Sequence, residues 1–299
     1  MRGAAEWFPP ENRAKAVGLF LCGLSVGALI TPPLVAWITT VYGWRASFLV
    51  TGALGFLLLP PWLGLHRRIQ RVYGAPDPAP AHGLEPGPDA STGEDLSLAE
   101  ALRRRKYWCV LAARAVTDGA WYFCLFWMPG YFQEARGFDV QMVGQWLWIP
   151  YFSADLGALA GAWASSALIQ RGFGVDRGRK SVLIPSALLG ALGGLTCLVS
   201  RPSFAVALIT VALFGHLSWS SNIHTVITEI SPRRHLAVLY GITGAAGTLA
   251  GALSQPVIGR VVDATGYGPA FAGFGAAYLL ALVLLLAAGR IEPLRRPRS

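Results

Sequence analysis

Charged residues are scarce in this chain. They make up 14% of its 299 residues, whereas 54% of the residues are hydrophobic and 11 are tryptophan. In an average soluble domain about a quarter of the residues are charged. The shortage of charge, together with the abundance of tryptophan, therefore excludes an ordinary soluble domain.

Motifs of several protein classes are also missing. The sequence contains no phosphate-binding glycine loop, no nucleophile elbow and no HExxH helix. Its few cysteines have neither paired spacing nor a histidine pattern for zinc; they are Cys22, Cys109, Cys124 and Cys197. The first residues, MRGAAEWFPPENRA, lack the apolar core of a secretory signal, so we expect no cleaved leader. We expect no enzymatic activity, no cofactor and no metal site.

What the chain does contain is long apolar stretches. A helix that crosses the hydrocarbon core of a bilayer takes about 20 mostly apolar residues. Eight stretches qualify, namely residues 16–41, 46–66, 107–132, 142–170, 181–199, 203–228, 236–262 and 267–289. Many contain internal glycine and proline, which membrane helices tolerate, and the short alternating segments of a barrel are missing. The sequence predicts an all-α integral membrane protein with eight transmembrane helices.

Residues 67–106 interrupt this apolar pattern. The segment begins with Arg67, Arg68 and Arg71, continues through prolines and scattered acids, and ends with four cations at residues 103–106. Such a composition cannot bury enough apolar surface to fold alone. It predicts a mobile linker with a basic cluster at each end.

The net charge of +9 by itself suggests nucleic acid as a partner, so the positions of the cations along the chain have to be considered. When the loops are assigned alternately to two sides of a membrane, one side holds only Arg45, Arg136, Arg201 and Arg260 of the 25 lysines and arginines. Arg114 lies within a span, and all others share the side of both termini and the linker. By the positive-inside rule that side is cytoplasmic. The cations thus predict topology and argue against nucleic-acid binding.

A long internal repeat relates the two ends of the chain. At one constant offset, identical residues pair as Pro9 with Pro232, Gly18 with Gly241, Pro33 with Pro256, Gly43 with Gly266, Phe48 with Phe271 and Gly52 with Gly275. Glycine and proline set backbone conformation, so their agreement is informative. Transporters often carry long parallel repeats of this kind.

The repeat predicts two six-helix halves, of which this chain holds eight helices. Residues 1–66 are then the end of the first half, 67–106 the cytoplasmic linker, 107–290 the second half and 291–299 a cytoplasmic tail. Four helices precede the repeated unit in the second copy and none precedes it in the first. We therefore expect further residues upstream in the natural protein; a shortened gene and a misplaced start codon explain the difference equally well.

On these residues the chain resembles the major facilitator superfamily, and within it the anion:cation symporters, especially bacterial hexuronate transporters. The resemblance covers residues 5–290. It rests on the passages AEWFPPENRAKAVGLF, YGWRASF, TDGAWYFCLFWMPGYFQEARGFD, IPYFSADLGALAGAWASSALIQRG with DRGRKS, and GHLSWSSNIHTVITEISP. The loop around Asp176, Arg177, Arg179 and Lys180 resembles the second-half copy of the superfamily's cytoplasmic gate motif.

The resemblance implies a monomeric secondary carrier of the inner membrane that moves a small organic anion, such as a hexuronate, together with protons. Family members depend on charged residues of helices 1 and 4 and on a gate motif between helices 2 and 3, none of which falls in this chain. Two other functions stay open: a truncated membrane fragment that does not transport, and a carrier of another anion such as phosphate or a dicarboxylate.

Ionisable residues inside spans are functional candidates, because each costs roughly 2.5–3.5 kcal/mol at the bilayer centre. Arg114 and Asp118 share a helix face. Either Asp118 takes part in charge movement and Arg114 attracts a sugar carboxylate, or the two form a structural pair. Asp155 has no cation near it in sequence. Such a carboxylate suits a proton carrier, whereas the alternatives are a hydrogen bond to a neighbouring helix and pairing with Arg114.

Polar and aromatic side chains in the spans supply candidate substrate contacts. Asn222 lies in an unusually polar span that the resemblance turns toward the central cavity, and its amide suits a substrate hydroxyl or holds helices together. Trp121 and Tyr122 present faces that stack on sugar rings. Gln255 either lines the cavity or satisfies a carbonyl freed by Pro256.

Three further groups in the spans favour structural interpretations. Trp127 and Tyr131 fit an interfacial belt better than a substrate site. His216 is better explained as structural. A run of glycines in the seventh span predicts close helix packing: Gly241, Gly244, Gly247 and Gly251.

Overall fold

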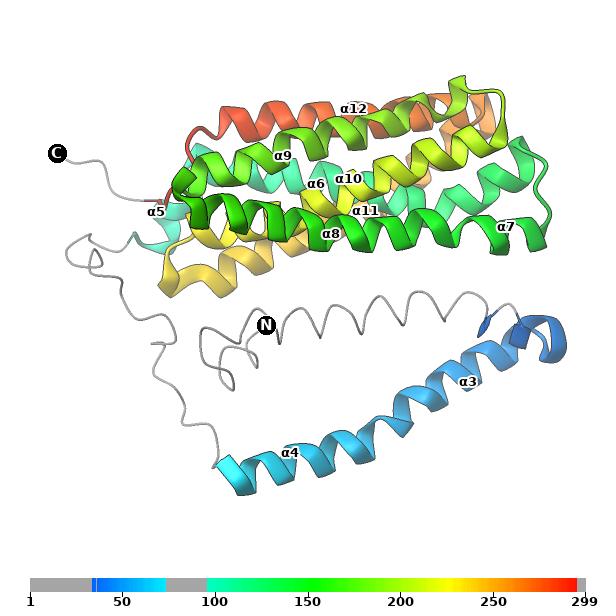
Figure 1. The fold of residues 1–299 in the computed structure, drawn as a ribbon, viewed down its shortest axis with the longest axis horizontal. Helices are drawn as coiled ribbons and strands as arrows, with labels where there is room; N and C mark the ends of the chain where they lie inside the picture. The colour runs from blue at the N-terminus through cyan, green and yellow to red at the C-terminus, as the bar shows by residue number, and fades with distance from the viewer. Residues whose placement is uncertain (1–33, 36, 74–95, 295–299) are drawn as a thin grey trace. The chain divides into compact units, whose positions relative to one another are not determined.

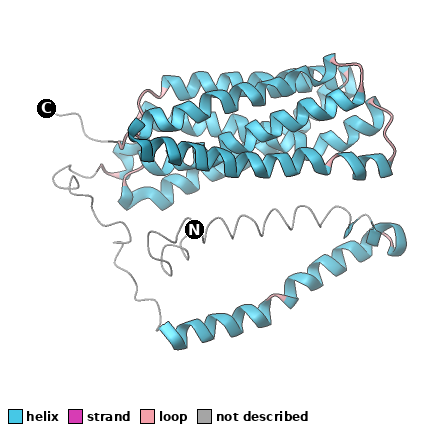
Figure 2. Cartoon of the chain, viewed as in Figure 1, coloured by secondary structure: helices cyan, strands magenta, loops and turns pink. Residues whose placement is uncertain are grey.

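The computed structural model describes residues 34–35, 37–73 and 96–294, and this part of the chain consists of helices and loops without strands (Figures 1 and 2). The chain divides into two compact units, Met1–Thr92 and Gly93–Ser299. Seven helices of the described residues are long and apolar enough to cross a membrane. They confirm seven of the predicted spans. The eighth, residues 16–41, lies mostly outside the described residues.

Two helices, α3 (Trp44–Leu57) and α4 (Leu59–Tyr73), make up most of the described part of the first unit. Trp44–Leu65 forms the apolar span, and the hydroxyls of Thr39 and Ser47 lie 2.8 Å apart at its start. Helix α4 continues to Tyr73, into the segment predicted as linker. Its basic residues lie toward the carboxyl end of the helix, where cations interact favourably with the helix dipole.

Gly43 and Gly266 adopt the same backbone conformation. Gly43 precedes α3 with φ 81° and ψ 162°, and Gly266 precedes α12 (Tyr267–Ala287) with φ 78° and ψ −174°. This region of backbone space is essentially restricted to glycine. The two residues are partners in the sequence repeat, so the repeat extends to the turn between helices in both copies.

The described part of the second unit is a bundle of six long helical segments (Figure 1). In order they are α6 (Arg105–Gly130) with η1 (Tyr131–Ala135); α7 (Val140–Trp146) and α8 (Trp148–Leu168) with η2 (Ile169–Phe173); α9 (Val175–Ala191) with η3 (Leu192–Leu198); α10 (Pro202–Ile230); α11 (Leu236–Thr265), preceded by η4 (Arg233–His235); and α12. Helix α10 packs against α8 and α9, and α6 packs against α11 and α12.

Small residues set the closest helix contacts. A Cβ at Gly157 would lie 2.1 Å from the Phe214 carbonyl oxygen, and one at Gly161 would lie 2.2 Å from Ser218 Oγ. Helix α10 therefore approaches α8 at distances that only glycine permits. On α11 the predicted packing surface is confirmed at Gly247 and Gly251, whereas a Cβ at Gly241 would meet nothing within 4 Å.

One end of the bundle contains α5 (Leu98–Leu102) and is called here the α5 end. Helix α5 and the segment after α12 lie across it. Ser97 and Glu100 form a capping box at the start of α5, so part of the predicted linker is helical. After α12 the chain crosses this end: Leu294 N–H donates to the Ile230 carbonyl at 2.9 Å, and Ile291 N–H donates to Asp176 Oδ1 at 2.8 Å. The segment thus joins α9, α10 and α12.

The opposite end, which contains α7, is organised around Tyr131. Only 1% of Tyr131 is exposed, so the prediction of an interfacial belt is wrong for this residue. Its hydroxyl accepts from Arg136 Nε at 2.6 Å, and the same guanidinium donates to the Thr196 carbonyl at 3.0 Å. The hydrogen bonds allow the ring to lie inside the bundle instead of at its surface.

Candidate functional site

Arg114 and Asp118 form an ion pair within the second unit. Both lie on α6, one turn apart, and Nε of Arg114 lies 3.3 Å from Oδ2 of Asp118. Nη1 of Arg114 also donates to Oγ1 of Thr243 on α11 at 3.0 Å. Only 8% of the arginine is exposed. Carboxylate and hydroxyl together offset the cost of holding a guanidinium inside the span.

The same faces of α6 and α11 stay in contact over three further turns. The contacts are Asp118 against Gly247, Tyr122 against Gly251, and the indole N–H of Trp127 donating to Gln255 Oε1 at 2.9 Å. Gly247 and Gly251 of α11 each face a large side chain of α6. The result is a continuous line of polar and aromatic groups along one helix pair, which includes three of the predicted binding residues.

Gln255 has a second set of contacts. Its amide N–H donates to the Gly251 carbonyl at 3.1 Å and to Ser254 Oγ at 3.2 Å. The carbonyl that Pro256 leaves without its helical partner is that of Ala252, one residue further on. The amide of Gln255 therefore does not satisfy the freed carbonyl, and it serves to orient Trp127.

Tyr240 connects Arg114 to His224. The guanidinium carbon of Arg114 lies 5.4 Å from the centre of the Tyr240 ring, and the His224 ring lies edge-on to the same ring at 6.0 Å. Nε2 of His224 is buried without a hydrogen-bond partner among the described residues. Buried polar atoms normally have a partner, so the cluster of Arg114, Tyr240 and His224 retains capacity for one more polar group.

Trp121 turns away from this cluster toward α10. Its ring stacks on His216 at 4.9 Å with an angle of 8° between the planes, and it lies edge-on to Tyr151 of α8 at 6.2 Å. Nδ1 of His216 contacts the Tyr278 hydroxyl of α12 at 2.5 Å. The histidine therefore joins α10 to α6 and α12, which agrees with the structural role predicted for it.

Asp155 lies on α8 and is half-buried. Within the described residues its carboxylate forms no hydrogen bond and no ion pair. The alternative that it pairs with Arg114 is not realised, because that arginine pairs with Asp118. Asp155 lies one turn beyond Tyr151 and so shares the helix face that packs toward Trp121 of α6.

Asn222 belongs to a second polar cluster, separate from Arg114. The residue is 0% exposed. Its amide N–H donates to the Ser218 carbonyl at 2.9 Å, and its Oδ1 accepts from Arg179 Nη1 at 3.4 Å. Arg179 also donates to Glu229 Oε1 from Nη2 at 2.8 Å and to Ser165 Oγ from Nη1 at 2.7 Å. One guanidinium thus ties α9 to α8 and α10.

The remaining residues of the resembled gate motif lie at the α5 end. Nζ of Lys180 lies 2.7 Å from Oδ1 of Asp176, and the same oxygen accepts from Ile291 N–H. Arg177 is exposed. A cavity of about 710 Å³ lies beside these residues and is also lined by Glu229 and Arg290. Oε2 of Glu229 is buried without a partner among the described residues.

The structure therefore places six of the predicted site residues in two clusters. Arg114, Asp118, Tyr122 and Gln255 lie along α6 and α11, whereas Asn222 and Arg179 lie among α8, α9 and α10. Three partners in these clusters are not among the residues predicted from the sequence: Thr243, Tyr240 and Glu229. Glu229 carries a detectable signal, because a carboxylate near the end of an apolar span needs a cation; Thr243 and Tyr240 carry none.

The comparisons with known proteins agree with this fold. Residues 1–174 match the sequence profile of the Major Facilitator Superfamily. The Hexuronate transporter of Escherichia coli (strain K12) is 31% identical over 91% of this chain. The Galacturonate transporter of Dickeya chrysanthemi is 31% identical over 69% of it. The chain spans 64% and 61% of the lengths of these two relatives, respectively.

A solved structure gives the same result at the level of the fold. The crystal structure of a bacterial homolog to the human lysosomal transporter Spinster matches with a TM-score of 0.51 at 17% identity, covering 95% of this chain and 71% of that one. Together with the match of the sequence profile to more than half of the chain, the bundle of membrane-spanning helices leads to one assignment: the chain belongs to the Major Facilitator Superfamily.

Proposed function

We propose that the protein is a secondary active carrier that moves a hexuronate, or a closely related sugar acid, across the membrane together with protons. The observation that carries the proposal is the similarity, at 31% identity, to two relatives named as hexuronate and galacturonate transporters. The ion pair of Arg114 and Asp118 on α6 also supports the proposal, because a carrier of organic anions needs a cation within its spans.

Arg114 is the proposed recognition point for the sugar carboxylate. A guanidinium presents a planar set of donors that matches a carboxylate, and Thr243 and Asp118 occupy its Nη1 and Nε. Nε2 of His224 lies beside the shared Tyr240 ring, has no hydrogen-bond partner among the described residues, and supplies a further polar contact. An anion at this point competes with Asp118 for Arg114, so substrate binding and the protonation of Asp118 favour each other.

Asp118 and Asp155 are the proposed proton carriers. Asp118 loses its ionic partner when Arg114 turns to the substrate, and its carboxylate is then free to accept a proton. The carboxylate of Asp155 has no hydrogen-bond or ionic partner among the described residues. The inward proton gradient then drives the loaded carrier toward the inside.

The hydroxyl groups of the substrate require neutral donors and acceptors. Tyr122 supplies an aromatic face, and Gln255 supplies an amide near Trp127. Asn222 contributes only when Arg179 releases its Oδ1. The gate proposed for Asp176, Arg177, Arg179 and Lys180 provides such a release, because movement of α9 relative to α10 separates Arg179 from Glu229.

In this proposal the two termini and the linker are cytoplasmic, and the carrier acts as a monomer. Residues 1–66 and 107–290 belong to two halves that rock against each other, with the 67–106 linker between them and 291–299 as a tail. The positions of the lysines and arginines along the sequence support this orientation.

Uptake by the purified chain in proteoliposomes tests the proposal. With an imposed inward proton gradient, labelled glucuronate and galacturonate should accumulate, each should compete with the other, and glucose should not compete. A protonophore should abolish accumulation but leave exchange of labelled for unlabelled substrate intact. Uptake of phosphate or a dicarboxylate, with no uptake of either sugar acid, would overturn the substrate assignment, and uptake of none of them would support a membrane fragment that does not transport.

A further inference from the structure

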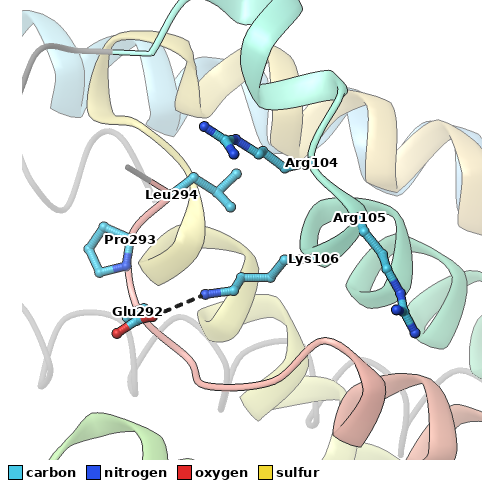
Figure 3. A pocket seen from close by; sticks show the side chains of 6 residues that line it. All are labelled: Arg104, Arg105, Lys106, Glu292, Pro293 and Leu294. Atoms are coloured by element: carbon cyan, nitrogen blue, oxygen red, sulfur yellow. Dashed lines mark ion pairs between the residues drawn. The ribbon is translucent and has the colours of Figure 1, made fainter. Parts of the chain in front are cut away.

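A basic pocket lies at the α5 end, outside the clusters described above. It has a volume of about 420 Å³ and is lined by Arg104, Arg105, Lys106, Glu292, Pro293 and Leu294 (Figure 3). Its size falls within the range of roughly 300–1,000 Å³ that is usual for small-molecule sites. Three cations and one acid line it, so the pocket suits an anion.

The geometry of the lining residues is asymmetric. In Figure 3 the side chains of Arg104 and Lys106 extend toward the segment that contains Glu292 and Leu294, whereas Arg105 extends away from it. Nζ of Lys106 lies 3.6 Å from Oε1 of Glu292, whose side chain is 58% exposed. This long, solvent-exposed ion pair is a weak one. An incoming anion can therefore share Lys106 with Glu292 at low cost.

The charges at this place are not offset by the helix that follows. Helix α6 begins at Arg105, and no acid lies in its first turn. Cations are unfavourable at the amino end of a helix, where the dipole is already positive. Three of the four charged residues that line the pocket are cations, so the pocket has a positive potential.

The pocket lies at the depth of lipid headgroups. The membrane-spanning segment Arg105–Ala135 begins at its wall. Trp108, 49% exposed, lies in the first turn of that segment, with its indole N–H on the Leu102 carbonyl at 2.6 Å. Tryptophan is enriched at this level of the bilayer. A soluble anion reaches the pocket only from water, whereas a lipid phosphate is present there at high local concentration.

We propose that this pocket binds the phosphate of an anionic phospholipid. The phosphodiester contacts Arg104 and Lys106, and the acyl chains extend along the exposed surface near Trp108. Basic clusters next to a membrane helix attract anionic headgroups in this way. The contact would tie the start of α6 and the segment after α12 to the same lipid.

Native mass spectrometry of the detergent-purified full chain tests the proposal, with phosphatidylglycerol and phosphatidylcholine added separately. The wild type should retain phosphatidylglycerol and not phosphatidylcholine. Replacing Arg104 and Lys106 by glutamine should weaken phosphatidylglycerol binding by about fivefold for each cation removed. The matched controls Arg201→Gln and Arg260→Gln, which neutralise exposed cations outside the pocket, should leave binding unchanged.

A variant with the opposite effect separates binding from folding. Glu292→Gln removes the acid that competes for Lys106, so it should strengthen phosphatidylglycerol binding by a similar factor. Equal retention of the two lipids by the wild type, or no strengthening by Glu292→Gln, would overturn the proposal. Displacement of phosphatidylglycerol by millimolar inorganic phosphate or glycerol phosphate would assign the pocket to a soluble anion instead.

Discussion

The carboxylate of Asp118 lies directly against the α carbon of Gly247: a Cβ at position 247 would lie 2.0 Å from Asp118 Oδ2 and 2.9 Å from its Cγ. Real Cβ contacts do not occur at such distances. The glycine of α11 therefore makes the space in which the Arg114–Asp118 ion pair lies, and helix packing and the charge pair depend on the same position.

Gly247→Ala should displace Asp118 and weaken its ion pair with Arg114. Overpacking of this kind costs about 1–3 kcal/mol, which should appear as a lower unfolding temperature in detergent and as reduced sugar-acid uptake. Gly241→Ala is the matched control, because a Cβ at Gly241 meets nothing within 4 Å on the same helix. Equal effects of the two substitutions would contradict the packing argument.

Single and double variants of Arg114 and Asp118 separate the part these residues play in transport from the stability of their ion pair. Arg114→Gln or Asp118→Asn alone leaves a charge in the span without its partner, which costs about 3–5 kcal/mol for a buried pair. The double variant leaves neither charge and should recover most of that stability, but it should not take up galacturonate. Thermal unfolding and uptake measured on all four proteins form a complete cycle. A double variant that transports at the wild-type rate would make the pair purely structural.

Much of the fold could be predicted from the sequence, because membrane spans follow from length and hydropathy alone. The seven described spans agree with the predicted ones to within a few residues, apart from the start of α9, which extends to include the charged residues Asp176–Lys180. Hydropathy underestimates helices whose first turn is charged. For the same reason, hydropathy does not predict that both ends of the linker 67–106 are helical. Ser97 and Glu100 nevertheless carry the pattern of a capping box.

The partners within the candidate site could be predicted only in part. The pairing of Arg114 with Asp118 follows from their spacing on one helix. The contact of Arg114 with Thr243 depends on how α6 and α11 are rotated against each other, which the sequence does not specify. For Asn222 the sequence leaves open a substrate contact and a contact between helices, and it does not identify Arg179 as the partner. Polarity alone does not distinguish a cavity face from a polar contact between helices.

Arg179 should contribute more to stability than Asp176, Arg177 and Lys180, the other residues of the resembled gate motif. Its guanidinium donates to Glu229, Ser165 and Asn222, which belong to two other helices. Arg179→Gln leaves the Glu229 carboxylate without its cation, and we expect a loss of about 3 kcal/mol. Arg179→Lys should restore stability only in part, because an ammonium cannot reproduce the planar set of donors. Arg177→Gln, at an exposed position, should change stability by less than about 0.5 kcal/mol.

Unfolding temperatures of the Arg179, Glu229 and Arg177 variants in detergent provide the measurement. Glu229→Gln together with Arg179→Gln should be less destabilising than Arg179→Gln alone, since no uncompensated carboxylate remains. If Arg177→Gln lowers the unfolding temperature as much as Arg179→Gln does, the guanidinium contacts of Arg179 contribute little to the bundle.

Asp155 offers the most direct test of proton coupling, because its carboxylate has no ionic partner among the described residues whose loss would complicate the result. Asp155→Asn keeps the shape of the side chain and removes its proton. Accumulation of galacturonate against its gradient should therefore be lost, while exchange of labelled for unlabelled galacturonate across proteoliposomes continues at a rate near that of the wild type. Asp263→Asn, which neutralises an exposed acid on α11, should retain both activities. Accumulation by Asp155→Asn at the wild-type level would remove Asp155 from the proton pathway and leave Asp118 as the remaining candidate, since Asp118 is the other predicted proton carrier of the second unit.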